Sequence, residues 1–391
     1  MNGYNLTTIV WGEKFIKNFT DFVIPSLLAE GNVSYLSKKF NVYYQIFTYK
    51  HSINLIKNSE SFKELEKYCN IIFETNSLDE QKKEGKNDRY EITNICLSKS
   101  IKNANKNSNP WVRVQPDVLQ AKNNYKTLHD LIEKKYKIIF YPMGLRTSKN
   151  ICIELNRKHK KGNILNIENF ELVHLAMKYA IKKEEHKIYN NYKPTNFQQN
   201  VFWSLGEKGY LERSINAGEL ICIYPSNKNM DYNFKSISIE ASDYLEVAVP
   251  DKKDWVFIKN SNDFVTCGIE DSLEEGNSIF LKKQKSIFLN KPSRLAIALS
   301  NVNMNHSKML KNSFLEHPIK YFSIKNHELK NDEWLKIEKK TRFYATQIIF
   351  ISKILSFFPT INKLARWYVK FYIRFYEKLK HSRKFSKFFF N

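Results

Sequence analysis

The stretch "NPWVRVQPDVLQAKNNYKTLHDL", residues 109–131, holds the pattern on which the interpretation of the chain depends. A short apolar run typical of a buried strand follows Pro110 and ends at Asp117, and helical spacing begins soon after. Asp is a common helix N-cap, so one interpretation makes Asp117 the cap of the helix that follows. Ligands of open α/β sheets bind outside the carboxyl ends of the strands, so the other interpretation makes Asp117 a binding carboxylate.

Short apolar runs alternate with helix-like segments on both sides of this stretch. Strands are expected at residues 6–12, 42–49, 70–74, 111–117, 137–142, 219–225, 236–241, 254–260 and 294–301. Helices are expected at 13–28, 61–68, 124–135 and 169–186, and polar loops at 75–88 and 189–199. This alternation predicts an α/β fold in which helices flank a mixed, mostly parallel sheet.

The length and composition indicate a folded chain with an appendage. Of the 391 residues, 42% are hydrophobic, including 28 Phe and 22 Tyr, which is enough apolar surface to offset the entropy of ordering the chain. We expect one main domain at residues 1–340 and a separate tail at 341–391. The five cysteines are odd in number, widely spaced and mostly within apolar runs, which predicts buried free thiols rather than disulfides or a zinc site.

The net charge of +23 has two explanations. Lysine supplies most of it, and abundant Asn, Ile, Tyr and Phe beside it are what an AT-rich coding sequence gives whatever the function. A functional basic surface would instead cluster the charge. From residue 341 to 391 there are eleven Lys and Arg and one acid, a local balance of +10, so the charge is concentrated in the tail.

The tail has the pattern of an amphipathic basic helix. Five cations recur at spacings of three and four, which places them on one helix face: Lys363, Arg366, Lys370, Arg374 and Lys378. Aromatic and aliphatic residues cover most of the other side, and Trp367 lies at the edge of the cationic face. This pattern predicts binding to an anionic membrane surface.

Neither a membrane span nor an export signal is expected. The longest apolar segment, residues 344–361, contains Lys353 and Pro359 and is shorter than about 20 clean apolar residues. The first fifteen residues lack a basic region followed by an apolar core and a cleavage site. We therefore expect a cytoplasmic protein, peripheral on the inner face of the cytoplasmic membrane.

The order of several segments resembles a known group of proteins. These segments include "IVWGEKFIKNFTDFVIPSLLAEGN", "FNVYYQIFTYKH", "VQPDVLQAKNNYKTL", "KIIFYPMGLR" and "VFWSLGEKGYLERSINAGELICIYP". Over roughly residues 5–345 the chain resembles bacterial glycosyltransferase-like proteins with a GT-A-type nucleotide-sugar-binding domain, associated with surface polysaccharide synthesis. The resemblance implies a GT-A-like fold and a nucleotide-sugar donor at Trp11, Gly12 and Asp117.

One departure from that group concerns the metal. GT-A enzymes commonly bind a divalent ion such as Mg²⁺ or Mn²⁺ through an Asp-any-Asp pair, and the ion offsets the charge of the diphosphate. Gln115, Pro116 and Asp117 offer one carboxylate where two would be expected. A metal at Asp117 is therefore doubtful, and Arg146, closing the next strand in "YPMGLR", is a candidate for the positive charge, with a surface ion pair as its alternative role.

The resemblance also suggests catalytic and acceptor-binding residues. Candidates for the general base are Glu240, Asp243 and Asp263, each with a turn or cap as the alternative, and a fourth catalytic candidate is His327, just before the helix-like segment "EWLKIEKKTR". The stretch "FWSLGEKGYLERS" is expected to be a loop that presents Trp203, Gly206 and Glu207 to the acceptor, because aromatic rings stack on sugars and carboxylates accept their hydroxyl protons.

The expected function is transfer of a sugar from a nucleotide-sugar to a lipid-linked or surface-glycan acceptor. Two alternatives come from other classes of protein. The lone Asp117 is compatible with a non-catalytic scaffold or sugar-binding protein. The basic charge is compatible with a nucleic-acid binder, although the globular part has no recognisable nucleic-acid-binding motif, so no nucleic-acid partner is expected. Nucleotide-sugar binding with turnover would separate the three.

Overall fold

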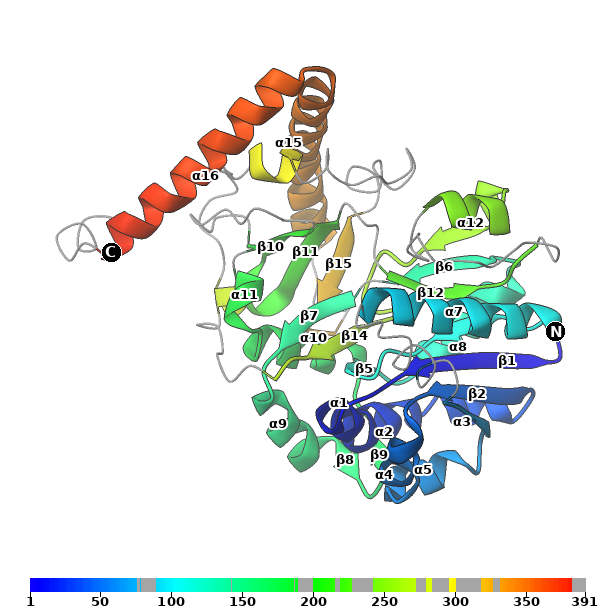
Figure 1. Cartoon of the computed structure of the whole chain (residues 1–391). Coiled ribbons are helices and arrows are strands. Elements are labelled where there is room, and N and C mark those ends of the chain that lie inside the picture. The colour runs from blue at the N-terminus through cyan, green and yellow to red at the C-terminus, as the bar shows by residue number, and fades with distance from the viewer. Residues whose placement is uncertain are drawn as a thin grey trace.

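The computed structural model describes residues 1–75, 78, 89–141, 143–185, 187–188, 200–214, 219–226, 242–271, 279–282, 295–299, 318–325 and 331–381. Its centre is a sheet of seven strands in the order β13-β6-β12-β4-β1-β2-β3 (Figure 1). These strands are β1 (Gly3–Ile9), β2 (Asn41–Phe47), β3 (Asn70–Glu74), β4 (Trp111–Arg113), β6 (Ile138–Tyr141), β12 (Glu219–Ile223) and β13 (Trp255–Phe257). Only β12 runs antiparallel to its neighbours, β4 and β6. The prediction of a mixed, mostly parallel sheet flanked by helices is confirmed.

Helices cover both faces of this sheet because its side chains alternate between two cores. Trp111, Ile138 and Phe140 point into one core, with α7 (Arg89–Lys106) and α12 (Ser242–Ala248). Val112 and Ile139 point into the other core. The helices of that second face are α1 (Glu13–Asn18), the π-helical segment η1 (Phe19–Val23), α2 (Ile24–Leu27), α3 (Val33–Ser37), α4 (Ile53–Lys57), α5 (Glu60–Leu65) and α8 (Asn124–Glu133). Both faces are therefore apolar, as expected for a largely parallel sheet.

Two three-stranded sheets extend the domain. One has the order β5-β14-β7, with β5 (Val118–Gln120), β14 (Thr266–Ile269) and β7 (Met143–Thr147), and the other the order β10-β11-β15, with β10 (Asn200–Ser204), β11 (Gly209–Ser214) and β15 (Ile319–Phe322). Around them lie α9 (Asn150–Lys158), α10 (Asn169–Lys178), α11 (Lys182–Glu185) and the small pair β8 (Lys160–Lys161) and β9 (Ile164–Leu165). Short 3₁₀ turns are η2 (Lys50–Ser52), η3 (Gly206–Lys208), η4 (Lys252–Asp254) and η5 (Ile279–Leu281).

The tail consists of two helices, α15 (Asn331–Phe357) and α16 (Pro359–His381). α15 lies against the β10-β11-β15 sheet, and α16 leads away from it (Figure 1). The tail is helical as predicted, but α15 runs without interruption through the boundary set after residue 340. Ile337 and Tyr344, on the two sides of that boundary, belong to one apolar cluster. The first part of the tail is thus built into the core of the domain.

One expected strand is a helix. Residues 295–299, within the run expected to form a strand at 294–301, are helical, and Ala296, Ile297 and Ala298 are buried in the cluster that contains α15. A short run of apolar residues fits a buried strand or a buried helix equally well, because periodicity cannot separate the two over so few residues. The expected strand at 236–241 lies outside the described residues.

The cysteines are as predicted. All five are free, and all are buried except the partly exposed Cys152. Burial raises the pKa of the Cys96 thiol to about 12, and the same effect raises the pKa of Cys152 to about 12. These thiols are therefore uncharged at neutral pH and act as small apolar side chains.

Candidate functional site

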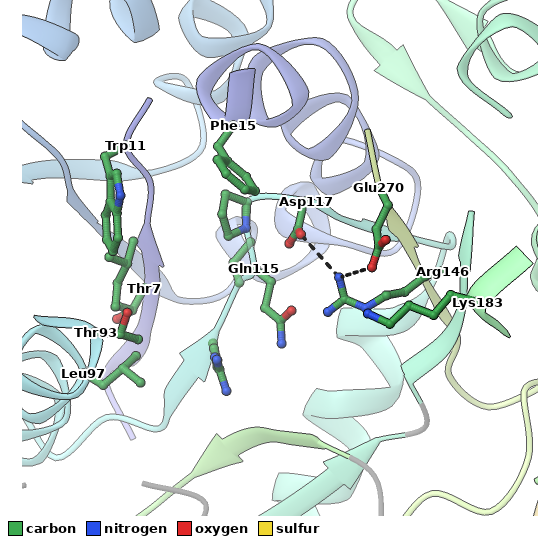
Figure 2. Close-up of a pocket in the computed structure, with 14 residues that line it drawn as sticks. Thr7, Trp11, Phe15, Thr93, Leu97, Gln115, Asp117, Arg146, Lys183 and Glu270 are labelled. Atoms are coloured by element: carbon green, nitrogen blue, oxygen red, sulfur yellow. Dashed lines mark hydrogen bonds and ion pairs between the residues drawn. The ribbon is translucent and has the colours of Figure 1, made fainter. Parts of the chain in front are cut away.

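A pocket of about 820 Å³ lies at the carboxyl ends of β1 and β4 (Figure 2). The main sheet supplies one wall and the β5-β14-β7 sheet supplies the other. The lining residues are Thr7, Ile9, Trp11, Phe15, Thr93, Leu97, Arg113, Val114, Gln115, Pro116, Asp117, Arg146, Lys183 and Glu270. Three of the four residues expected to bind the donor, Trp11, Asp117 and Arg146, are thus brought together, although up to 135 positions separate them in sequence.

Trp11 is placed by the end of β1. The amide of Val10 donates to the carbonyl of Phe47, 2.9 Å away, which keeps β1 paired with β2 up to that point. Trp11 then packs at the edge of the cluster formed around Phe47 and Cys96 and stays partly exposed to the pocket. Gly12, the fourth expected donor residue, has φ 81° and turns the chain into α1, a conformation that favours glycine.

Asp117 lies in the turn between β4 and β5. Its carbonyl accepts a 2.8 Å hydrogen bond from the amide of Ile269, and its side chain is 18% exposed and points into the pocket. The N-cap interpretation is wrong, because α8 begins at Asn124 and the residue in its N-cap position is Asn123. Asp117 is therefore a half-buried carboxylate at the mouth of the central strands.

Arg146 lies between two carboxylates. Its Nη1 is 3.3 Å from Oε1 of Glu270 and 3.9 Å from Oδ2 of Asp117. The ion pair named as the alternative for Arg146 is present, but it lies inside the pocket. Arg146 does not close the strand at 137–142 as expected: β6 ends at Tyr141, and Arg146 is part of β7 in the second sheet.

The electrostatics of the pocket favour an anion. Burial raises the pKa of the Asp117 carboxyl, and the Arg146 guanidinium opposes that rise. The lining contains three cations, Arg113, Arg146 and Lys183, and two acids, Asp117 and Glu270. Next to it, Asp271 forms ion pairs with both Lys14 and Lys149. A ligand that carries negative charge would meet a net positive surface here.

The residues present do not fit the metal site that the family resemblance implies. Within the described ranges, no group of three or more His, Cys, Asp or Glu is arranged to hold a metal ion. The segment from Gln115 to Asp117 contributes one carboxylate, and the second acid of the pocket, Glu270, comes from another sheet. Both acids contact Arg146.

The residues expected to bind the acceptor lie elsewhere. The stretch around them is a hairpin, β10 and β11, and not a loop, and the ring of Trp203 is 1% exposed in the cluster beneath α15. Trp203 is therefore a core residue, because alternate residues of β10 face that cluster. Gly206 and Glu207 form the turn of the hairpin, where the Glu207 carbonyl accepts a hydrogen bond from Ser323, the residue after β15.

The expected catalytic acids are not in the described pocket. Asp263 is exposed, lies three residues before β14 and accepts a 2.6 Å hydrogen bond from Asn260, whereas Glu270 directly follows the other end of that strand. Asp243 falls within α12, but its side chain is not among those described. Glu240 and His327 lie outside the described residues. The catalytic roles expected for Glu240, Asp243, Asp263 and His327 therefore all stay predictions.

Three charged residues of the pocket were missed by the sequence analysis: Glu270, Lys183 and Arg113. The signal for Glu270 was present, because the run "FVTCGI" at residues 264–269 ends in an acid, as the run before Asp117 does. Arg113 lies within a strand that was predicted, but nothing in the sequence shows that its side chain reaches a pocket. Lys183 is one of many lysines, and only the fold places it here.

The tail helices expose the residues expected to face a membrane. Lys363, Arg366, Lys370 and Arg374 are exposed, and the ring of Trp367 is 65% exposed and stacked on Phe371 at 5.6 Å. The side chain of Lys378 is not among those described. Other exposed apolar side chains on the two helices are Phe343, Phe350, Phe357, Phe358, Ile361, Leu364 and Tyr368. Among the described helices, none has the length and apolar character that a membrane crossing requires.

No family model matches the sequence, and no curated protein matches it. Among solved structures, the chain is similar to residues 1–349 of S. aureus TarS, with 12% identity and a TM-score of 0.30 over 95% of this chain and 88% of that one. It is also similar to mouse xyloside xylosyltransferase 1, with 12% identity and a TM-score of 0.24 over 40% of this chain and 58% of that one. A third similarity is to a glucose-1-phosphate thymidylyltransferase from Bacillus anthracis, with 10% identity and a TM-score of 0.21 over 37% of this chain and 55% of that one. The chain thus spans little more than half the length of the last two, and at these TM-scores the similarities establish neither a shared fold nor a shared activity.

Proposed function

We propose that the chain is a glycosyltransferase with a GT-A-like fold that binds a nucleotide-sugar in the pocket at the ends of β1 and β4. The observation that supports this most directly is the meeting of an aromatic ring, a half-buried carboxylate and three cations at the carboxyl ends of parallel strands. That edge of an open α/β sheet is where such folds bind nucleotides.

Each part of a nucleotide-sugar has a matching group in the pocket. The ring of Trp11 is an aromatic surface on which a nucleobase stacks. The Asp117 carboxylate accepts hydrogen bonds from ribose hydroxyls, and Arg113, Arg146 and Lys183 offset the charge of the diphosphate. In the transfer, the bond from the sugar to the diphosphate breaks, the acceptor oxygen bonds to the sugar carbon, and the acceptor proton passes to a base. The cations stabilise the charge that develops on the departing diphosphate.

The acceptor in this proposal is a lipid-linked or surface glycan, and the enzyme works on the inner, cytoplasmic face of the membrane. What supports this is α16, where exposed cations lie beside exposed aromatic rings, the combination that binds anionic headgroups and the outer acyl chains together. Between Pro359 and Arg374 the sequence has no acid to offset the four cations. The tail then holds the pocket beside acceptors that are themselves carried by lipid.

The test of the donor is thermal stabilisation by UDP-, GDP-, CMP- and dTDP-sugars. A ligand at a hundred times its dissociation constant stabilises the folded state by about 2.7 kcal/mol. One of the four should raise the melting temperature of the wild-type protein. The variant Trp11→Ala should lose this stabilisation, whereas Trp367→Ala, which removes an exposed tryptophan far along the chain on α16, should keep it.

Turnover separates the proposal from its two alternatives. Release of the free nucleotide from the stabilising donor, in the presence of membrane extract as a source of acceptor, supports a transferase. Stabilisation without turnover would favour a non-catalytic scaffold or sugar-binding protein. Stabilisation by none of the four donors, together with salt-sensitive binding to duplex or single-stranded nucleic acid, would overturn the proposal in favour of a nucleic-acid binder.

A further inference from the structure

Arg146 has two acidic partners that come from different parts of the chain. Asp117 belongs to the turn after β4, and Glu270 follows β14. In Figure 2 both carboxylates point toward the same guanidinium nitrogen. Two carboxylates this close to each other repel unless a cation lies between them, so the guanidinium takes the place of a counter-ion.

Backbone pairing fixes these three residues before any ligand arrives. The amide of Ile269 donates to the Asp117 carbonyl at 2.8 Å, and the amide of Glu270 donates to the Thr147 carbonyl at 2.8 Å. Arg146 pairs with Gly268 in the ladder between β7 and β14, where a Cβ on Gly268 would lie 3.2 Å from Cγ of Arg146. The absence of a side chain at Gly268 therefore leaves room for the stem of Arg146 beside it.

The two contacts are those of a guanidinium placed between two carboxylates. Carboxylate oxygens bind Mg²⁺ or Ca²⁺ at about 2.0–2.6 Å in a closed shell of several oxygens. Here the two oxygens lie 3.3 and 3.9 Å from one nitrogen. A guanidinium carries five N–H donors in a planar fork, so one arginine can contact two carboxylates and a phosphate at the same time.

We propose that Arg146 is a built-in counter-cation that occupies the position of a divalent metal ion between Asp117 and Glu270, so that the pocket binds a diphosphate without a metal. The part of this inference that concerns the diphosphate rests on the proposed function. The part that concerns the cation position is a property of the protein alone and can be tested without any nucleotide.

The test measures binding of Mn²⁺ to the protein by electron paramagnetic resonance. The wild-type pocket should not bind Mn²⁺. Arg146→Met, which keeps an unbranched apolar stem and removes the charge, leaves two carboxylates around an empty position and should raise the affinity for Mn²⁺ at least about tenfold. Adding Glu270→Gln to that variant should abolish the gain.

Two controls separate this effect from a change in net charge. Arg146→Lys keeps a cation between the acids and should not gain Mn²⁺. Lys183→Met removes a different cation of the same pocket and should not gain it either. The melting temperature of each variant shows whether it is folded, and the Arg146 side chain is 32% exposed, so we expect its replacement to leave the fold intact.

Either of two results would overturn the inference. One is Mn²⁺ binding by the wild-type protein that Asp117→Asn abolishes, because the metal would then already occupy this position. The other is a folded Arg146→Met variant with no gain of Mn²⁺. With the donor found by thermal stabilisation, EDTA should change the affinity of the wild-type protein less than twofold, and a loss of binding in EDTA would also count against the inference. If no donor binds at all, the proposed function fails while the Mn²⁺ result still stands.

Discussion

The pocket and the tail both carry cations, but they differ in how many acids accompany those cations. In and beside the pocket, cations are matched by acids: Arg146 contacts Asp117 and Glu270, and Asp271 contacts Lys14 and Lys149. From Pro359 to Arg374 the tail has four cations and no acid in its sequence. Paired charges in a pocket are fixed in direction and weakly screened, whereas unmatched charges on an exposed helix attract any anionic surface and are screened by salt.

The difference indicates two kinds of recognition. A ligand of the pocket must fit the positions of several fixed groups, so the pocket is suited to one class of small anion. The tail presents cations beside exposed rings without a shaped site, which suits a surface made of many equivalent headgroups. If this contrast is correct, substitutions in one region should leave the activity of the other unchanged.

The largest expected effect is on the tail. The change replaces four cations of the tail together by Gln: Lys363, Arg366, Lys370 and Arg374. Partition onto phosphatidylglycerol vesicles should then fall roughly a thousandfold, since each cation near an anionic leaflet contributes about 1 kcal/mol. Flotation at low and high salt measures it. Donor binding in solution should be unchanged.

A matched control carries the same change in charge elsewhere. The control replaces four exposed lysines of the main domain by Gln, which also removes four charges: Lys38, Lys39, Lys57 and Lys134. This control should float as the wild-type protein does. Equal loss in both quadruple variants would show that net charge governs binding, and the distinction between pocket and tail would then not hold. Truncation after residue 340 is unsuitable for this purpose, because Thr341 and Tyr344 are buried in the domain.

The second effect is on β11, in the sheet against which α15 packs. Alternate residues of this strand face opposite sides. Arg213 is buried toward α15, where its Nε donates a 3.0 Å hydrogen bond to Oγ1 of Thr341. Glu212 is buried toward the domain core, where it accepts a 2.8 Å hydrogen bond from Tyr321. Burial raises the pKa of Glu212 to about 7 from its usual 4.5, with Lys187 opposing the rise and Glu184 adding to it.

Stability should therefore fall as the pH rises from about 4.5 to about 7. Over this range the folded state keeps the proton of Glu212, while the unfolded state releases it. The free-energy cost of burying the ionised carboxylate is therefore absent below the range and complete above it. Glu212→Gln keeps the acceptor for Tyr321 and removes that cost, which is about 3 kcal/mol above pH 7. Urea unfolding at pH 5 and pH 8 measures it, and the gain from the substitution should be larger at pH 8. An equal loss of stability at both pH values would mean that Glu212 is ionised and stabilising in the fold.

The third effect concerns Asp117. Asp117→Asn keeps the shape of the side chain and removes its charge, so loss of a charged hydrogen bond of about 1.5–3 kcal/mol should reduce donor affinity or turnover by about 10- to 100-fold. The melting temperature should change little. Asp130→Asn, the same substitution at an exposed position on α8, is the control and should have wild-type activity. Full activity in Asp117→Asn would remove this residue from the site.

What could be predicted from the sequence differs between the two walls of the pocket. Trp11 and Asp117 follow strands of the main sheet, whose strong apolar runs mark their ends, and both line the pocket. The other wall is the β5-β14-β7 sheet, which pairs residues near 119, 145 and 267 through strands of three to five residues. Such short strands carry little periodic signal, and their pairing depends on contacts between distant segments. Glu270 was therefore missed, and Arg146 was assigned to the wrong strand.

For the tail, the faces of a helix could be predicted, but the residue at which the tail begins could not. The two faces of α16 follow from a regular spacing over many residues, and the described cations of that helix and Trp367 are exposed. That these side chains bind a membrane stays a prediction. Where the tail begins could not be predicted, because the residues that bury the start of α15, such as Trp203 and Leu211, belong to another sheet. Trp203 was consequently taken for an exposed ring in a loop.

The smallest expected effect is at Glu207, in the hairpin turn that was expected to bind the acceptor. Its side chain is exposed, its carbonyl accepts a hydrogen bond from Ser323, and the neighbouring Lys208 forms an ion pair with Glu333 at the start of α15. The turn is thus attached to α15 through Lys208 and to the end of β15 through the backbone carbonyl of Glu207, and Glu207→Ala removes neither contact. The variant should unfold within about 0.5 kcal/mol of the wild-type protein and keep its turnover and its binding to vesicles. A loss of turnover with unchanged donor affinity would instead place the acceptor at this turn, and the functional site would then extend from the pocket to the base of the tail.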